Sequence, residues 1–554
     1  MTAGTIKKNW DIIVIAVIVL LTLSQTLKNE LIWDDIFIIK NNPNIGDSHK
    51  LFEVVSVPFW ENSSYTEKPL TNFWRPFTSL SIWLVGLITS QAWIFHLLSM
   101  IASLAAAFTF GLFIQSTSEK HIPLRTIFYL SSVYAIHPLT VETTCLVSNI
   151  SDHLALTFLF LTCYYTSLYI NSTQHTRILV ILFLTAFLAA ASKEFGLLSV
   201  AIPLGYSLIY KGTNKTKSQK YSKILLPSGI VLLSATIFLI VRYFVVSVSE
   251  FTVGRDVAYL TLSQFIVGYG AAFKHIFFLS PAGTMLQISS PIPYIVFGVV
   301  CVISFSLLLV LFLNKSPYLK TLLFAFLLGL LLLGPSFITV QLNAFNNYEY
   351  PTRYFHILLF GILPFTIPAT IKFSNSKFTG WIVVSIISLL AIISFIRIEQ
   401  WRTPLTLYAE EYRLNPQSER NVLYFSEELV AHNAFTDAER SISTFQMKHS
   451  FRTPYYIARK HSLLSQIYFL RDGNLKKAIQ EGKTALKTYP YAPILVTRMA
   501  RVISASGNQQ IALKLLRDAL NDKNFSSAQK YRFHEEIQFL NRLNHPDQPK
   551  GINE

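Results

Sequence analysis

The chain has 554 residues, of which 51% are hydrophobic and only 14% are charged. Soluble proteins carry about 25% charged residues, so the excess apolar surface must face something other than water, and lipid is the candidate. The net charge of +16 does not indicate nucleic-acid binding, because the basic residues are concentrated in short loops between apolar runs. Three cysteines lie in apolar stretches without a pairing or metal-binding pattern: Cys145, Cys163 and Cys301.

The first apolar run lies near the N-terminus. Lys7 and Lys8 precede Ile12–Leu23, an arrangement that signal peptides share. No small-residue cleavage site follows this run, so we expect an uncleaved first membrane span.

Further apolar runs recur through the first 400 residues. A spanning helix needs about 20 predominantly apolar residues. Residues 76–89 are shorter and aromatic, and we expect a helix in the membrane interface. Residues 260–280 are long enough to span, but Gly268 and Gly270 also allow a re-entrant hairpin. Eleven spans are predicted: 11–27, 93–115, 126–144, 153–170, 177–192, 195–210, 224–246, 292–313, 319–340, 354–371 and 379–397.

Loop charge predicts the orientation, because cytoplasmic loops carry an excess of Lys and Arg. With the N-terminus in the cytoplasm, eleven spans place the lysine-rich loop 211–223 there too. Counting 260–280 as a further span would move Lys315 and Lys372 outside, so we expect a hairpin that stays on the outer side. The odd count then puts the C-terminal domain in a periplasm, a lumen or the exterior, and we expect a bacterial inner membrane rather than the endoplasmic reticulum.

The composition changes near Trp401, where charge density rises and long apolar runs stop. A repeat follows with an offset of 34 residues: Gly473-Asn474 recurs as Gly507-Asn508, and Ala478 as Ala512. The unit resembles a tetratricopeptide repeat, with small residues at the helix crossing and Gly-Asn at the turn. We therefore predict a TPR-like α-solenoid over 401–545, followed by a tail over 546–554. Such solenoids expose a concave surface, so we expect it to bind an acceptor protein.

Ionisable residues gather near one face of the predicted membrane region. Such groups are costly at membrane depth and mark candidate functional sites. Six segments contribute: Asp34 and Asp35 after the first span, Arg75 in FWRPF, His137 and Glu142 in AIHPLTVET, Asp152 beside His153, Lys193 and Glu194 in ASKEFG, and Arg353 in YEYPTRYFHI.

Each of these residues also has an ordinary explanation. The two aspartates can mark the membrane interface, the arginines can be snorkelling anchors, and Lys193 and Glu194 can neutralise each other in a turn. The convergence of six segments on one face is what predicts a site.

Transfer of a sugar from a polyprenyl phosphate uses this mixture of groups. A carboxylate takes the proton of the acceptor hydroxyl, and Arg and Lys stabilise the charge on the departing phosphate. The donor's apolar tail lies in lipid, which explains a site built on spanning helices. Because the cations supply the positive charge, we expect no metal and no cofactor. Displacement with one carboxylate base predicts inversion at the anomeric carbon.

The order of motifs resembles the transmembrane-and-TPR (TMTC) O-mannosyltransferase family and its bacterial relatives, which belong to the GT-C class of membrane glycosyltransferases. The resemblance rests on the acidic pair, WRPF, FHLL at 95–98, AIHPLTVET, SKEFG, TRY and the repeats. It implies an all-α GT-C domain over 1–400 with a first outer loop at 28–92. It also implies a polyprenyl- or dolichyl-phosphate hexose as donor, mannose or another, and Ser or Thr of a protein as acceptor. By motif position, Asp34 looks like the catalytic carboxylate and Asp35 its neighbour, so both are candidate catalytic residues; which of the two points into the site stays open, and we expect the other segments to bind donor or acceptor.

Three alternatives remain open. EKPL at 67–70 resembles the lipid A aminoarabinose transferases, which favours a lipid or glycan acceptor. A membrane-anchored assembly scaffold would need only one span. A transporter would carry its charges near the bilayer midplane rather than at one face.

Overall fold

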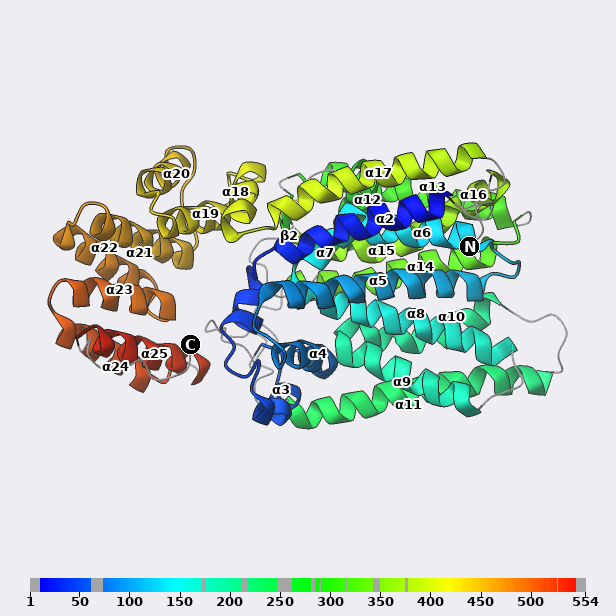
Figure 1. The fold of residues 1–554 in the computed structure, drawn as a ribbon, viewed down its shortest axis with the longest axis horizontal. Coiled ribbons are helices and arrows are strands. Elements are labelled where there is room, and N and C mark those ends of the chain that lie inside the picture. The colour runs from blue at the N-terminus through cyan, green and yellow to red at the C-terminus, as the bar shows by residue number, and fades with distance from the viewer. Residues whose placement is uncertain are drawn as a thin grey trace. The chain divides into compact units, whose positions relative to one another are not determined.

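The computed structural model describes residues 10–60, 73–171, 176–210, 217–246, 262–279, 284–288, 290–313, 316–341, 349–373, 377–525 and 527–544. These residues form 24 α-helices and one two-stranded sheet, which confirms the expected helical fold (Figure 1). They divide into two compact units at Thr403 and Pro404, here named the membrane unit and the C-terminal unit. Several sequence expectations lie outside the described residues, namely those on Lys7, Lys8, the EKPL segment, Lys211, Lys215, Lys315 and the tail 546–554.

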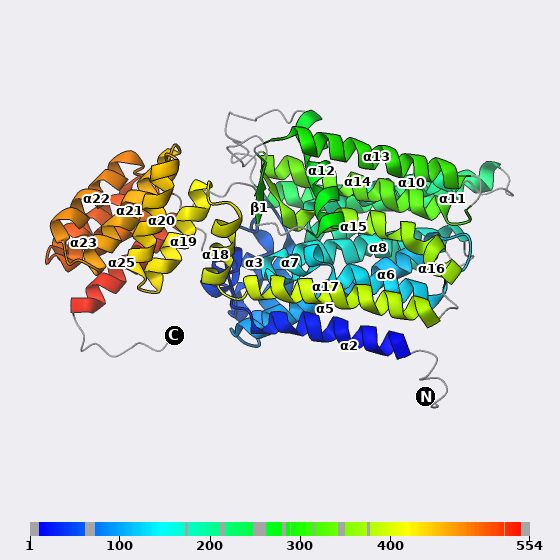
Figure 2. The same ribbon diagram turned by 90° about the horizontal axis from the view of Figure 1, so that it is seen from above.

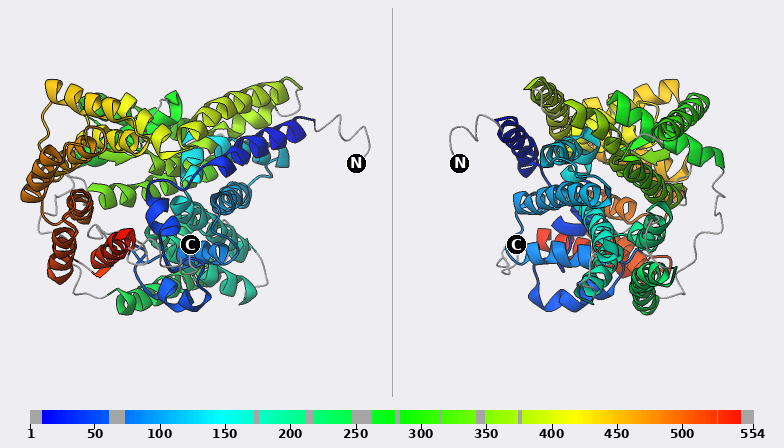
Figure 3. Two further views of the ribbon diagram at one scale, coloured as in Figure 1. Left: turned by 60° about the vertical axis from the view of Figure 1, so that its left-hand side comes forward. Right: turned by 90° about the vertical axis from the view of Figure 1, so that its right-hand side faces the viewer.

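The membrane unit is a bundle of long helices that run side by side (Figures 1 and 2), and the right-hand view of Figure 3 looks along it. Short helices and one small sheet lie at the ends of the long ones. The helices are α2 (Trp10–Ser24), α3 (Leu51–Ser56), α4 (Pro76–Gly86), α5 (Ala92–Thr117), α6 (Leu124–Ile136), α7 (Pro138–Cys145), α8 (Ile150–Asn171), α9 (Thr176–Ser192), α10 (Ala201–Ile209), α11 (Lys217–Val245), α12 (Leu262–Phe278), α13 (Ile292–Leu313), α14 (Leu319–Gln341), α15 (His356–Ile362), α16 (Ile367–Phe373) and α17 (Lys377–Gln400).

Seven segments among the described residues are long and apolar enough to cross a membrane: Trp10–Lys28, Ala92–Thr117, Val147–Asn171, Leu225–Val245, Ile292–Val310, Thr352–Lys372 and Phe378–Gln400. They expose large apolar side chains such as Leu21, Phe108 and Phe244. The chain therefore has the make-up of a polytopic membrane protein.

The other four expected spans are shorter apolar helices, so the count of eleven crossings stays a prediction. The expected span 126–144 is one example, in which the helix is interrupted before it is long enough to cross a membrane. Its helix α6 ends at Ile136, and the chain restarts as α7 at Pro138. Proline is well suited to the first turn of a helix but lacks the N–H that would continue the previous one.

Helix α12 corrects the expectation of a hairpin at 260–280. It continues without a break through Gly268 and Gly270, because these glycines serve close packing: a Cβ on Gly270 would lie 2.0 Å from the Tyr294 carbonyl oxygen. The start of α12 and the strand that comes after it in sequence nevertheless both contact one strand, β2 (Glu349–Pro351). The Gln264 carbonyl accepts from the Tyr350 hydroxyl at 2.6 Å, and β1 (Met285–Gln287), which follows the helix, pairs antiparallel with β2.

The two ends of the bundle differ in their polar groups. Helices α2 and α17 run in the same direction, since Trp10 contacts Trp381 at their starts and Trp33 contacts Trp401 just beyond their ends. The starting end carries the ion pair of Arg125 with Asp11, 2.9 Å apart, and other basic residues such as Lys320. The opposite end, where α2 and α17 finish, carries the residues of the predicted site and is named the site end.

The C-terminal unit is a series of helices joined by short turns: α18 (Pro404–Leu414), α19 (Glu419–Ala431), α20 (Phe435–Lys448), α21 (Pro454–Leu470), α22 (Leu475–Thr488), α23 (Pro493–Ala505), α24 (Gln509–Asn521) and α25 (Ser527–Asn544). Gly473 (φ +60°) and Gly507 (φ +82°) occupy equivalent turns, α21–α22 and α23–α24. Only glycine adopts such angles without cost, which explains the 34-residue recurrence. A Cβ on Gly482 would lie 2.3 Å from Met499 Sδ, so a larger residue where α22 meets α23 would force the Met499 side chain to move.

Candidate functional site

Two ion pairs, one of them buried and one partly exposed, connect four of the predicted residues at the site end. Arg75, which precedes α4, donates from Nε and Nη2 to the two carboxylate oxygens of Glu194, at 2.9 and 2.8 Å. Lys193 Nζ donates to Asp152 Oδ2 at 2.6 Å, and both of these side chains are almost fully buried. Lys193 and Glu194 are neighbours at the end of α9, yet each pairs with a distant segment. The alternative in which they neutralise each other is therefore wrong.

Arg353 lies between two aromatic rings in the short helix η7 (Thr352–Tyr354). Its guanidinium carbon is 5.0 Å from the centre of the Trp33 ring and 5.3 Å from that of Tyr354. Lys193 Nζ lies 4.6 Å from the same Tyr354 ring. The Arg353 Nε and Nη1 atoms are buried and have no hydrogen-bond partner among the described residues. The charge of Asp34 attracts this guanidinium.

The two adjacent aspartates occupy different environments. Asp35 is fully buried, and its carboxylate accepts from the backbone N–H groups of Val147 (2.9 Å) and Ser148 (2.7 Å). Burial raises the pKa of Asp35 to about 7, although these two hydrogen bonds oppose the shift. Asp34 is partly exposed beside Arg353. The structure thus makes Asp35 a tie to the turn between α7 and α8, and Asp34 the better candidate for a base.

Trp33 precedes this pair in a strained conformation. Its φ of +51° lies in the left-handed region, where a large side chain costs free energy. Such outliers concentrate at functional sites, where the surrounding structure compensates for the strain. Here the strained residue supplies the ring that lies against Arg353.

The two predicted residues of the AIHPLTVET segment, His137 and Glu142, are buried against α7 and its neighbours rather than exposed at an opening. All eight residues of this helix are buried. Glu142 Oε1 accepts from the Thr352 hydroxyl at 2.9 Å, which connects α7 to the residue before Arg353. His137 Nδ1 accepts from the Leu139 N–H at 3.3 Å and caps the helix. Both residues position the site.

Two histidines belong to this cluster: the sequence reasoning named His153 beside Asp152 but gave it no role, and it did not single out His356. His153 and His356 are fully buried, with ring centres 5.9 Å apart. Asp152 Oδ1, His153 Nδ1 and His356 Nε2 are buried without a hydrogen-bond partner in the part of the chain that the structure describes. The signal was available, because His356 and Tyr354 flank Arg353 in an otherwise apolar span, and isolated polar residues in such spans are costly.

We expect Asp35→Asn to lower stability. The oxygen of the asparagine side chain can accept a hydrogen bond from one of the two backbone N–H groups. Its N–H₂ group then faces the other N–H, and the lost hydrogen bond lowers the free energy of unfolding by about 1–3 kcal/mol. Because the folded-state pKa of Asp35 is raised to about 7, the aspartate's contribution is largest below about pH 4 and falls as the pH rises through 7. The gap in unfolding midpoint between wild type and variant, measured in detergent, should therefore narrow from pH 5 to pH 8.

The matched control is Asp47→Asn, because the Asp47 carboxylate also accepts a backbone N–H, that of His49 at 2.9 Å, but at an exposed position. This control should change the midpoint little at either pH. An Asp35→Asn protein of unchanged stability would contradict the structural role of Asp35.

The arrangement combines a partly exposed carboxylate, an arginine with two nitrogens that have no hydrogen-bond partner among the described residues, and two ion pairs that hold their surroundings in place. Such a set can take up a proton and stabilise an anion. Within the described ranges, no group of three or more His, Cys, Asp or Glu side chains is placed to hold a metal ion. No protein-family model, no curated protein and no solved structure matches the chain.

Proposed function

We propose that the chain is a GT-C-type glycosyltransferase that moves a hexose, mannose or another, from a polyprenyl- or dolichyl-phosphate donor to Ser or Thr of a protein. The observation that carries the proposal is Arg353, whose Nε and Nη1 are buried without a partner among the described residues, beside the partly exposed Asp34. A guanidinium and a carboxylate side by side match the two charge changes of the reaction, at the leaving phosphate and at the acceptor hydroxyl.

Arg353 is the group proposed to bind the donor phosphate. A buried, unpaired guanidinium edge is costly, and a phosphate would satisfy it with two parallel charge-assisted hydrogen bonds. The Trp33 and Tyr354 rings, 5.0 and 5.3 Å from the guanidinium carbon, restrict the Arg353 side chain before binding, so less rotamer entropy is lost when it binds a phosphate. Arg75 is the weaker candidate, because Glu194 already occupies two of its nitrogens.

Asp34 is proposed as the base. The acceptor oxygen forms a bond to the anomeric carbon while its proton passes to the Asp34 carboxylate, and the bond from that carbon to the phosphate oxygen breaks with its electron pair. Lys193 and Arg353 then stabilise the phosphate charge, with Asp152 and Glu194 holding the neighbouring cations in place. Attack opposite to the departing phosphate inverts the anomeric carbon.

The C-terminal unit is proposed to be a TPR-like solenoid that holds the acceptor protein. The recurring glycine turns and the small residue at the crossing of α22 and α23 support this assignment. Because α17 ends at the site end, the chain leaves the membrane unit at the end that carries Asp34 and Arg353. The lysine-rich helix ends favour a cytoplasmic opposite end, so we propose that site and solenoid are periplasmic or extracellular.

Mass spectrometry of outer-side proteins from cells with and without this chain tests the function. We expect hexose on Ser or Thr of particular proteins to disappear when the chain is absent, and to return with wild type but not with Asp34→Asn. An unchanged protein glycan pattern together with altered lipid glycans would instead establish a lipid acceptor.

Arg353→Lys should lower kcat/KM for the donor by about tenfold or more. A lysine retains the charge but cannot reproduce the planar fork between the rings, and charge-assisted hydrogen bonds are each worth about 1.5–3 kcal/mol. Transfer rates are measured with purified protein and a synthetic lipid-linked sugar. The matched control is Arg177→Lys, an exposed arginine of α9, which should leave kcat/KM unchanged. Full activity in Arg353→Lys and in Arg353→Ala would reject the phosphate role.

A further inference from the structure

Three buried atoms at the site end take no part in the proposed proton transfer. They belong to Asp152 and His153 in the first turn of α8 and to His356, the first residue of α15. Asp152 Oδ1, His153 Nδ1 and His356 Nε2 have no hydrogen-bond partner among the described residues. Buried polar atoms of folded proteins are almost always hydrogen-bonded, so a set of three without partners indicates that a further molecule binds there.

The other hydrogen bond of His356 shows which nitrogen of its ring carries the proton. His356 Nδ1 lies 2.5 Å from the Arg353 carbonyl oxygen. A carbonyl oxygen only accepts hydrogen bonds, so the proton is on Nδ1. In the neutral ring the second nitrogen, Nε2, is therefore an acceptor.

The same reasoning applies to His153. Its Nε2 lies 3.2 Å from the Thr143 hydroxyl and 3.3 Å from the Thr144 hydroxyl. Both hydroxyls donate to the Thr140 carbonyl, at 2.6 and 3.0 Å. Since their protons are engaged, they accept from His153 Nε2, and the unpartnered Nδ1 is an acceptor. Together with the Asp152 carboxylate oxygen, all three unpartnered atoms are thus acceptors that need a donor.

The three acceptors form one cluster. The ring centres of His153 and His356 are 5.9 Å apart, and Asp152, the neighbour of His153, interacts electrostatically with His356. A ligand that satisfies the cluster must offer several O–H or N–H donors. The positive charges of Lys193 and Arg353 oppose a cationic ligand, so a neutral group with several hydroxyls fits best.

The cluster adjoins the proposed phosphate site. His356 is hydrogen-bonded to the Arg353 carbonyl, and Lys193, the partner of Asp152, lies 4.6 Å from the Tyr354 ring that also contacts Arg353. Arg353 is partly exposed, whereas His356 is fully buried, so the acceptors lie inward of the guanidinium. In a lipid-linked sugar the anomeric carbon is bonded to a phosphate oxygen, which places the sugar hydroxyls beside the phosphate.

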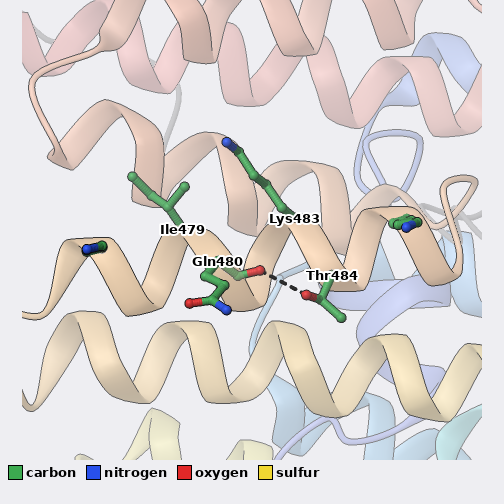
Figure 4. A pocket seen from close by; sticks show the side chains of 6 residues that line it. Ile479, Gln480, Lys483 and Thr484 are labelled. Atoms are coloured by element: carbon green, nitrogen blue, oxygen red, sulfur yellow. Dashed lines mark hydrogen bonds between the residues drawn. The ribbon is translucent and has the colours of Figure 1, made fainter.

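A groove in the C-terminal unit has a different character. It runs along α22 and is lined by Lys476, Ile479, Gln480, Lys483, Thr484 and Lys487 (Figure 4). Its polar side chains are exposed to solvent, and the Thr484 hydroxyl donates to the Gln480 carbonyl at 3.0 Å. Water satisfies exposed polar atoms, so such a surface discriminates little between ligands that differ by one hydroxyl.

We propose that Asp152 Oδ1, His153 Nδ1 and His356 Nε2 bind hydroxyl groups of the donor's hexose and so determine which hexose is used. The inference rests on the proposed function, because it takes a phosphate-linked hexose as the donor. Each hydroxyl would donate one hydrogen bond to a buried acceptor. A site of this kind rejects an analogue that lacks the matching hydroxyl, since the acceptor then stays buried and unpaired.

Two substitutions remove one acceptor and keep the other hydrogen bond of the ring. His356→Asn places an amide N–H₂ near the position of Nδ1, where it can donate to the Arg353 carbonyl, and has no acceptor at the position of Nε2. His153→Gln places its N–H₂ near the position of Nε2, facing Thr143 and Thr144, and has no acceptor at the position of Nδ1. Thermal unfolding in detergent checks that both variants fold.

The test measures dissociation constants of the purified full chain for a polyprenyl-phosphate hexose, for counterparts that each lack one hydroxyl, and for polyprenyl phosphate alone. The hexose is mannose, glucose or galactose, whichever binds most tightly. Tryptophan fluorescence reports binding, because Trp33 lies against Arg353. Wild type should bind the hexose more tightly than polyprenyl phosphate, and should bind at least one deoxy counterpart about three- to tenfold more weakly, the value of one neutral hydrogen bond.

The penalty for that missing hydroxyl should fall below about twofold in His356→Asn or in His153→Gln, because the acceptor it requires is gone. His121→Asn is the matched control, since His121 is an exposed histidine near the starting end, and it should keep the wild-type penalty. The wild-type comparison needs no variant, and one folded variant suffices for the cycle.

An equal penalty in wild type and both variants would mean that the acceptors hold internal water only, and would overturn the inference. Equal binding of polyprenyl phosphate and its hexose ester, or no penalty for any missing hydroxyl in wild type, would overturn it too. Both of these results leave the phosphate site and the proposed function standing. Failure of wild type to bind any of these lipids would instead reject the proposed function and the inference together.

Discussion

Purified Asp34→Asn protein, supplied with a synthetic polyprenyl-phosphate sugar, should lose transfer by about 10²–10⁴-fold, the usual value of general-base assistance. Asparagine has nearly the same shape but cannot take the acceptor proton. Asp34 is the partly exposed member of the acidic pair and lies in the field of Arg353, whereas both oxygens of Asp35 are occupied by backbone N–H groups. Turnover is measured by release of the lipid phosphate, and donor binding is measured separately by titration.

The comparison that makes this result specific is Asp35→Asn, which should lower stability more than it lowers turnover per folded molecule. Normal turnover in Asp34→Asn would refute the assignment of the base. A chelator should leave wild-type turnover unchanged, and loss of activity on chelation would point to a metal held by the aspartates and contradict the metal-free mechanism.

Lys193→Met should destabilise the membrane unit by about 3–5 kcal/mol, the usual cost of leaving one member of a buried ion pair uncompensated. Asp152 is fully buried, and Lys193 Nζ is its hydrogen-bond partner at 2.6 Å. Removal of the lysine leaves a carboxylate that stays desolvated without the Lys193 charge or takes up a proton, and either outcome costs free energy. Thermal unfolding of the membrane unit in detergent, followed by tryptophan fluorescence, measures the change.

The double variant Asp152→Asn with Lys193→Met should recover much of the loss, because it removes both charges together. Lys320→Met is the matched control, since Lys320 of α14 pairs with Glu119, in the bend that follows α5, at an exposed position. Exposed pairs contribute little to stability, so this variant should unfold at nearly the wild-type temperature. Equal destabilisation in the Lys193 and Lys320 variants would contradict the importance of burial.

The tertiary structure also changes how the acidic and basic motifs are interpreted. Each motif is short, and the sequence alone supports either a site or a set of interface anchors. Arg75 pairs with Glu194, 119 residues away, and Lys193 pairs with Asp152, 41 residues away. The Lys193–Asp152 pair is buried, whereas the Glu194 side chain is 32% exposed, and each pair holds its cation in place. Among the described residues, Arg353 Nε and Nη1 are buried without a hydrogen-bond partner, so Arg353 is better placed than Arg75 to bind an anion.

The sequence by itself determined the helical membrane-protein character and the repeat in the C-terminal unit. Hydrophobicity decides which segments prefer lipid, and it is a local property, so seven of the expected spans could be recognised from composition alone. The glycines at Gly473 and Gly507 are likewise local, because their turns require positive φ whatever lies around them.

Only the tertiary structure decided which partner each charged group has. The sequence could not separate Asp34 from Asp35, because that difference depends on the turn at Val147 and Ser148, more than 100 positions away. Nor could it show that Gly268 and Gly270 serve packing in α12 rather than a hairpin turn. Ion pairs and close contacts depend on distances between segments remote in sequence, and these distances are set by the packing of the whole bundle.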